Sequence, residues 1–196
     1  MVTLLDVKTT FNRVSNTLNE PSLSSIVSPQ NPFGFNTAVK GNDNKTTNSV
    51  MIYSKGLVVR YIDKSLITLH KEWIKQYKVI TPKAAEDGIL PGKVISTCSV
   101  IKPNTCCNGT YVVIGPFKSE SECKNAISYM YTKFARFLVG MKKMTQDLKD
   151  QTFALVPLQD FSKSWTDEEL YKKYELTENE IAFIESMIKP MSMSGE

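Results

Sequence analysis

Cationic and amide side chains gather in the segments that we expect to be loops, and these residue types can contact nucleic acids. Lysine and arginine suit phosphates and guanine, whereas asparagine and glutamine suit adenine. The alternative is that they are solvated surface, and lysines at a helix end also complement the helix dipole. The candidates for base edges are Gln30, Asn31, Lys83, Lys142, Lys143, Thr145 and Gln146, and those for phosphates are Lys40 and Lys45 on a polar loop.

Patterns for catalysis are mostly missing from the sequence. A Ser-His-Asp or Cys-His arrangement would have to use His70, the single histidine, and a surface or capping role is the alternative there. No G-x-G occurs among the nine glycines, and no G-x-x-x-x-G-K-[ST] occurs either. We therefore expect no bound cofactor.

Two short patterns keep metal-dependent nuclease chemistry open as an alternative. Glu122 and Lys124, and likewise Asp147 and Lys149, have the E/D-x-K spacing of some nuclease sites, but both pairs fall on a segment predicted to be helical.

Asn31 begins an Asn-Pro-Phe sequence that is superficially similar to the Asn-Pro-Pro-aromatic motif of adenine methyltransferases, with the second proline missing.

The four cysteines include an adjacent pair, Cys106 and Cys107, but no C-x-x-C. Zinc would need an unusual four-cysteine arrangement, and neighbouring cysteines rarely bond to each other. We expect reduced thiols and no metal site.

Charge is unevenly distributed along the 196 residues. Residues 151–196 hold four lysines against nine acids, or −5, whereas residues 1–150 hold 20 basic residues against 11 acids, or +9. A basic body with an acidic tail is typical of a polyanion binder, although ordinary unevenness of surface charge is the alternative.

The elements that position these residues centre on residues 110–161. An apolar strand at 111–114 and a Gly-Pro turn precede Ser119 and Glu122, which have the spacing of a capping box. Apolar residues then recur every three or four positions to Met141, which predicts one long helix, followed by a second apolar strand. The fold class is therefore α+β, with a mixed or antiparallel sheet packed by one long helix.

Other strands are expected at 50–53 and 57–62 as a hairpin, at 78–81, and at 94–101, with short helical turns at 22–27 and 71–76. The tail contains two further capping boxes, Thr166 with Glu169 and Thr177 with Glu180, each opening a short helix. Phe33 and Phe35 are expected in the core rather than stacked on bases.

Two regions follow from this pattern. Residues 1–161 form a basic domain, and residues 162–196 form an acidic helical tail that packs on the body or on a separate domain. No apolar run approaches the roughly 18 residues of a membrane span, and the N-terminus lacks the features of a secretory signal. We expect a cytoplasmic protein with no membrane partner.

Several segments together resemble a known family. They are residues 105–117, 131–138 and 144–146, and above all VPLQDFS at 156–162 with WTDEELYKKY at 165–174. These segments, with SPQNPFG at 28–34, look like the C-terminal target-recognition region of bacterial type II restriction-modification enzymes that methylate adenine. The resemblance covers roughly residues 20–190, and it matches Asn31, Thr145 and Gln146 to family positions.

The resemblance implies a module that reads double-stranded DNA for a methyltransferase or nuclease catalytic domain, upstream in the same chain or in a separate subunit. The cofactor loop of the family is not in this sequence, so the chain is expected to have no catalytic activity of its own. The alternatives are a protein–protein assembly module of a restriction system and a stand-alone metal-dependent nuclease.

Overall fold

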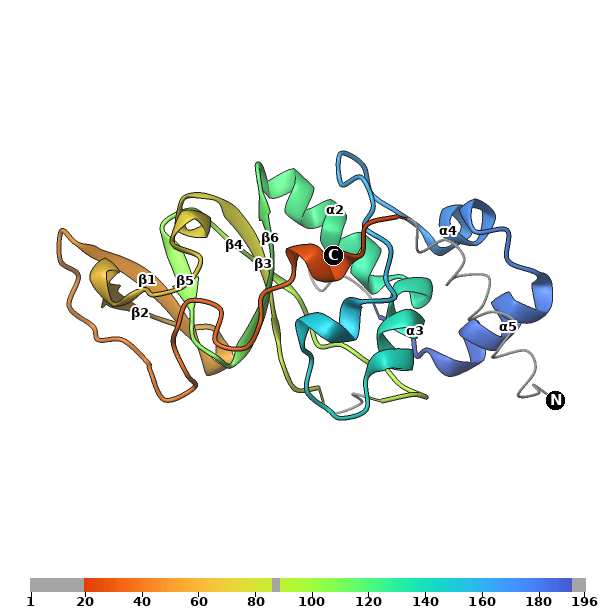
Figure 1. The fold of residues 1–196 in the computed structure, drawn as a ribbon, viewed down its shortest axis with the longest axis horizontal. Coiled ribbons are helices and arrows are strands. Elements are labelled where there is room, and N and C mark those ends of the chain that lie inside the picture. Colours follow the sequence, from red (N-terminus) through yellow and green to blue (C-terminus); the bar gives the residue numbers. More distant parts are fainter. Residues whose placement is uncertain (1–19, 86–88, 192–196) are drawn as a thin grey trace.

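The computed structural model describes residues 20–85 and 89–191. Figure 1 shows an elongated molecule with two small sheets at one end and in the middle, and with the helices at the other end. Strands occupy the first part of the chain and α-helices the last part, so the predicted α+β class is confirmed. Residues 4–18, in which Leu5, Phe11, Val14 and Leu18 have the spacing of one helical face, lie outside the described residues.

The first sheet has the strand order β2-β1-β5. β1 (Ser49–Ser54) and β2 (Val58–Asp63) form the predicted antiparallel hairpin, and β5 (Thr105–Cys107) lies parallel to β1. Side chains of β1 alternate between half-buried and buried, as expected for a strand with one face on a core. The buried face meets Phe33 and Phe35, which confirms their predicted place in the core.

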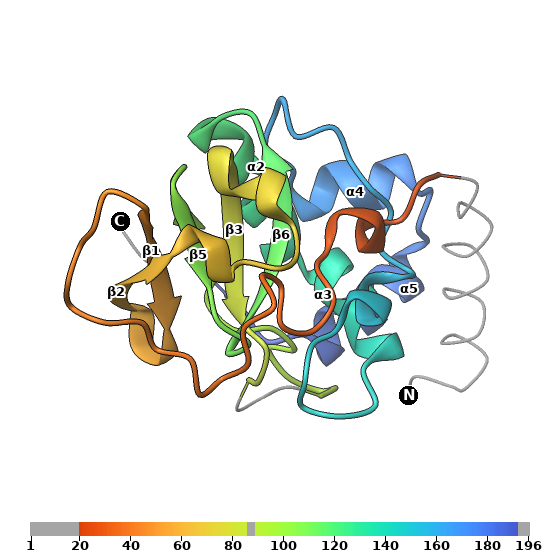
Figure 2. The ribbon, with the colours of Figure 1, turned by 60° about the vertical axis from the view of Figure 1, so that its left-hand side comes forward.

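The second sheet has the order β4-β3-β6 and is antiparallel throughout. β3 (Tyr77–Pro82) lies between β4 (Ser99–Ile101) and β6 (Tyr111–Phe117). Figure 2 shows this sheet between the first sheet and the helices. Because both of its faces are covered, β6 reads as a nearly continuous buried run.

The predicted long helix is instead two helices, α2 (Glu120–Tyr131) and α3 (Lys133–Lys142). The chain breaks at Thr132, whose ψ of 147° is not helical. The Thr132 hydroxyl accepts from Ala135 N–H, and Asp167 of the tail accepts from the N–H groups of Lys133 and Phe134. The new helix start is therefore fully capped, which a single continuous helix would not require.

One strand prediction was wrong and another was too long. The second apolar strand after the helices does not form: residues 154–158 follow the 3-10 helix η5 (Asp150–Phe153), and their strand-type pairing is an isolated bridge from Pro157 to Ser22. The strand predicted at 94–101 is reduced to β4. Val94, with a φ of +70°, cannot continue a strand, and the Lys143 ammonium binds its carbonyl.

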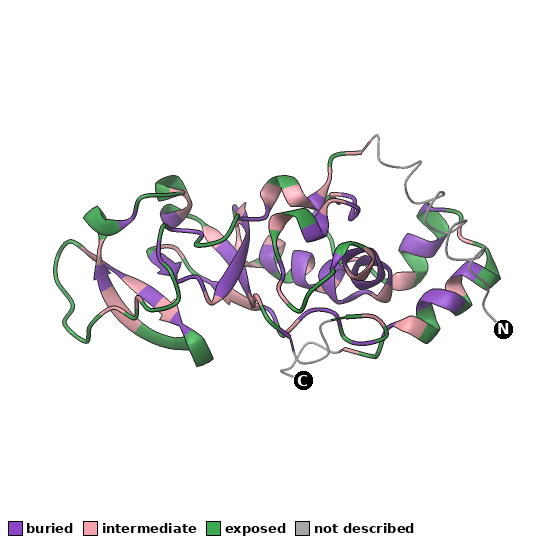
Figure 3. Cartoon of the chain, turned by 60° about the horizontal axis from the view of Figure 1, so that its bottom comes forward, coloured by how far each residue is buried: buried purple, intermediate pink, exposed green. Residues whose placement is uncertain are grey.

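The tail folds as predicted into α4 (Asp167–Lys173) and α5 (Glu178–Met187), and both capping boxes are present. Its apolar residues join the same core as α2 and α3; Phe134, for example, stacks on Tyr174 at 4.9 Å between ring centroids. Figure 3 shows buried residues continuing from the second sheet through these helices. The tail thus packs on the body.

Short 3-10 helices complete the fold: η1 (Leu23–Ile26), η2 (Lys55–Leu57), η3 (Lys64–Leu66) and η4 (Lys71–Lys75). They include the predicted turns at 22–27 and 71–76. Among the residues that the structure describes, no helix is both long and apolar enough to cross a bilayer.

Candidate nucleic-acid interface

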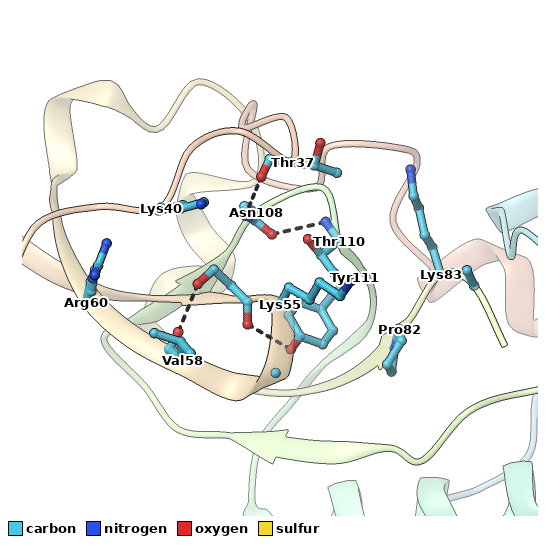
Figure 4. A pocket seen from close by; sticks show the side chains of 13 residues that line it. Thr37, Lys40, Lys55, Val58, Arg60, Pro82, Lys83, Asn108, Thr110 and Tyr111 are labelled. Atoms are coloured by element: carbon cyan, nitrogen blue, oxygen red, sulfur yellow. Dashed lines mark hydrogen bonds between the residues drawn. The ribbon is translucent and has the colours of Figure 1, made fainter. Parts of the chain in front are cut away.

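A groove of about 810 Å³ lies between the β1–β2 hairpin and the C-terminal end of β3. Four cationic residues line it, and no carboxylate does among the described residues: the cations are Lys40, Lys55, Arg60 and Lys83. In Figure 4, Lys40 and Arg60 lie on one side, Lys83 on the other, and Tyr111 between them. A concave surface of this charge attracts anions and concentrates the field inside it.

Lys40 reaches the groove because a buried amide holds its loop. Asn108 Nδ2 donates to the carbonyls of Thr37 and Val39, at 3.2 and 2.8 Å, and Asn108 Oδ1 accepts from Thr110 N–H at 3.0 Å. Thr37, Asn108 and Thr110 all line the groove, so these hydrogen bonds lie at its wall. Asn108 therefore acts as a clamp that attaches the loop before Lys40 to the start of β6.

Arg60 and Lys55 belong to the hairpin. Arg60 is on β2, opposite Ile52 of β1, and its Nε lies 3.2 Å from an oxygen of Asp43, which is largely exposed. An ion pair this open to water contributes little to stability and leaves the guanidinium available to a stronger anion. Lys55 is exposed in η2, at the turn between the strands.

Lys83 follows β3 directly, and its backbone is fixed on both sides. Its N–H donates to Thr110 O at 3.0 Å, and its carbonyl accepts from Leu148 N–H at 2.6 Å. The next residue, Ala84, forms a bridge with Asp147. This pairing brings the loop after α3 to the edge of the groove.

The loop after α3 carries a second, smaller hollow of about 430 Å³. Lys142 and Thr145 line it with Lys149, although Asp147 is also in the lining. Gln146 is exposed beside it. The structure thus brings together Lys142, Thr145 and Gln146 on the loop that meets Lys83.

Lys143 does not belong to this surface, which corrects its place among the candidates. The side chain is 4% exposed, and its ammonium donates to Val94 O at 2.7 Å. Burial lowers the pKa of Lys143 to about 8. Lys143 directly follows the exposed Lys142 at the end of α3, but its side chain turns inward and donates to the carbonyl of Val94 in the irregular segment before β4.

The three remaining candidates are exposed but lie outside both linings. Asn31, with a φ of +57°, has its side-chain oxygen against Gly109, where an added Cβ would approach it to 2.2 Å. Since Thr110 lines the groove, Asn31 lies beside its rim, and Gln30 precedes it on the same exposed loop. Lys45 lies in the exposed loop before β1.

Of the groove residues that sequence reasoning missed, four have a role in the site described above: Lys55, Arg60, Asn108 and Tyr111. The turn containing Lys55 was predicted, and a cation at a hairpin turn was a usable signal. Nothing local marks Asn108 or Tyr111, because the loop carbonyls that Asn108 holds and the turn that Tyr111 holds are more than 50 residues away. Their role depends on how the two sheets meet.

Metal-ligand geometry is not seen in residues 20–85 and 89–191, where no three His, Cys, Asp or Glu side chains lie close enough to hold a metal ion. All four cysteines are buried, and their thiols are free. Comparison with protein-family models and with curated proteins finds no match.

Proposed function

We propose that the chain binds double-stranded DNA through the groove and the adjoining loop, as the target-recognition module of a restriction-modification methyltransferase or endonuclease. The observation that carries this proposal is the convergence of four cations, from the loop at Lys40, the β1–β2 hairpin and the end of β3, on a concave surface whose described lining holds no carboxylate. In this role the chemistry belongs to a catalytic domain elsewhere, and this chain supplies affinity and sequence preference.

The division of labour follows from chemistry. The groove cations would neutralise phosphates and release counterions, which gives affinity that falls steeply with salt. Lys45 would add a phosphate contact from its exposed loop. Base edges would be read by the amide and hydroxyl side chains beside the groove: Gln30, Asn31, Thr145 and Gln146, with Lys142.

The acidic tail supports this orientation. Figure 1 places α4 and α5 at the end of the molecule opposite the first sheet. Their carboxylates begin each helix and serve as caps, as Glu169 and Glu180 do. A duplex on the groove would therefore avoid this negative charge.

A salt titration tests the proposal. The variant Lys40→Ala/Lys55→Ala/Arg60→Ala/Lys83→Ala should bind a fluorescein-labelled duplex with a log K against log [salt] slope that is shallower by about 3 to 4, at about 0.9 per lost phosphate contact. The matched control changes four exposed lysines that do not line the groove, Lys71, Lys75, Lys118 and Lys172, to alanine.

The control removes the same charge from the whole protein, so it should change the slope much less. Equal slopes for the two variants would contradict the proposal, because binding would then reflect net charge and not the groove. No salt-dependent duplex binding by the unaltered chain would also contradict it. If the chain were instead a protein–protein assembly module, both variants should still bind its protein partner.

A further inference from the structure

The turn of the β1–β2 hairpin has a strained backbone and an exposed apolar side chain. Gly56 and Leu57 both have left-handed φ values, +78° and +59°. Glycine adopts this conformation freely, but leucine adopts it only with backbone strain, because its Cβ approaches the following carbonyl oxygen. Leu57 is nonetheless 47% exposed, and the next residue, Val58, is 49% exposed. Folding alone does not account for a strained leucine that faces water.

A single buried phenol holds this turn from behind. The Tyr111 hydroxyl on β6 donates to Ser54 O at 2.9 Å and accepts from Leu57 N–H at 3.0 Å. Ser54 Oγ also donates to Val58 O at 3.3 Å. Residues 54–58 are therefore fixed from both ends of the turn, and Leu57 is presented in one orientation.

The turn also forms one wall of the groove. Lys55, Gly56 and Val58 line the same hollow as Lys40 and Lys83; Leu57, between Gly56 and Val58 in the chain, is not itself part of the lining. An apolar side chain flanked by cations matches the chemistry of proteins that insert a wedge between base pairs while basic residues hold the phosphates. A rigid mount is what such a wedge needs, since a mobile turn would move aside instead of separating the bases.

We propose that Leu57 is a DNA wedge, inserted at a base step by the turn 54–58, and that Tyr111 is the positioning residue that holds it. This inference rests on the proposed function and goes beyond it, because it predicts that bound DNA is unstacked at one step. Charge complementarity favours a duplex as the occupant, since Lys55 and Arg60 lie on either side of the exposed apolar run of Leu57, Val58 and Val59 in the sequence, and both cations line the groove.

The test uses the full chain and a duplex pool with a random central region, enriched by retention on the unaltered protein. Permanganate oxidation of unstacked thymines in bound duplex reports the wedge, and fluorescence anisotropy reports binding. Three variants are compared at saturating protein: Leu57→Ala, Tyr111→Phe and Leu66→Ala. Leu66 is the matched control, because it is 56% exposed and, unlike Leu57, its chain neighbours do not line the groove.

The unaltered protein and Leu66→Ala should make one thymine step strongly reactive. Leu57→Ala should return reactivity to the level of free DNA and weaken binding about tenfold, or roughly 1.4 kcal/mol, while its salt slope stays unchanged. Tyr111→Phe should lower reactivity at equal occupancy although Leu57 is intact. A merely structural tyrosine would change the thermal melt but not this reactivity.

Enhanced reactivity that persists in Leu57→Ala, or its absence from the unaltered protein when that protein binds, overturns the wedge and leaves the proposed function standing. No enrichment and no duplex binding overturns both. Equal effects of Leu57→Ala and Leu66→Ala also overturn the wedge, since the loss would then follow from exposed leucine in general. Retention of a protein partner through Leu57 without duplex binding would assign the turn to a protein interface and would overturn it too.

Discussion

Asn108→Ala tests how the groove is built. The side chain is 1% exposed and takes part in three hydrogen bonds, two to the loop before Lys40 and one to the backbone of Thr110. At about 1 kcal/mol net for each hydrogen bond, their loss would cost about 3 kcal/mol. Water can reach the carbonyls of exposed Thr37 and half-buried Val39 once the loop separates, so we expect a fall of about 2 kcal/mol in the free energy of unfolding.

The same change should release Lys40 from the groove. The salt slope of duplex binding should become shallower by about 1, as expected for one lost phosphate contact, and this should equal the effect of Lys40→Ala. In the double variant the two effects should not add, because Asn108 acts on binding only through Lys40. A double-mutant cycle measures this coupling directly.

Urea unfolding and fluorescence anisotropy across a salt series provide the two measurements. Asn44→Ala is the control, since Asn44 is an exposed amide in the neighbouring loop. Full additivity of Asn108→Ala and Lys40→Ala, or a slope unchanged in Asn108→Ala, would refute the reasoning, because the loop would then hold its place without the clamp.

Three further predictions concern stability and are measured by urea unfolding. Burial lowers the pKa of Lys78 from 10.5 to about 8, so between these pH values the unfolded chain binds the proton more tightly than the folded chain does. As pH rises from 8 to 10.5, the free energy of unfolding of the unaltered protein should therefore increase relative to that of Lys78→Met, by up to about 3 kcal/mol. A difference between the two proteins that stays constant with pH would contradict this. Asp167→Ala should cost about 1–2 kcal/mol by uncapping α3, with Glu168→Ala neutral; equal losses would count against the cap. Gly109→Ala should destabilise by about 1–3 kcal/mol, because the new Cβ displaces Asn31; an unchanged midpoint would exclude that close approach.

Local signals predicted the parts of the fold that local chemistry decides. The capping boxes at Thr166 and Thr177 start α4 and α5 where expected, and the Ser-Lys-Gly turn joins the hairpin strands. The break at Thr132 was missed because the apolar repeat continues across it. The new helix start is capped by the carboxylate of Asp167, which is 34 residues beyond Lys133 and becomes a cap only when the tail packs.

The candidate site was also predicted only in part, because local signals identify some of its residues whereas long-range pairing determines the others. Lys40 and Lys83 line the groove, and Lys142, Thr145 and Gln146 lie on the loop that meets it. Residue type and loop position were enough to select them. Long-range pairing selects Asn108 and Tyr111, and no pattern in the sequence shows that pairing.

Positive charge in this sequence also serves two different purposes, which net charge cannot separate. Lys78, Arg136 and Lys143 are each less than 5% exposed, and all three donate to backbone carbonyls: Lys78 to Trp73 and Gln76, Arg136 to Tyr131, Thr132 and Lys189, and Lys143 to Val94. These carbonyls lie at helix ends and irregular turns, where a backbone oxygen can accept from a side chain. The basic body predicted from composition is therefore partly an internal scaffold. Under the proposed function, a polyanion would contact the cations that line the groove, so affinity should follow the removal of these residues and not the net charge of the chain.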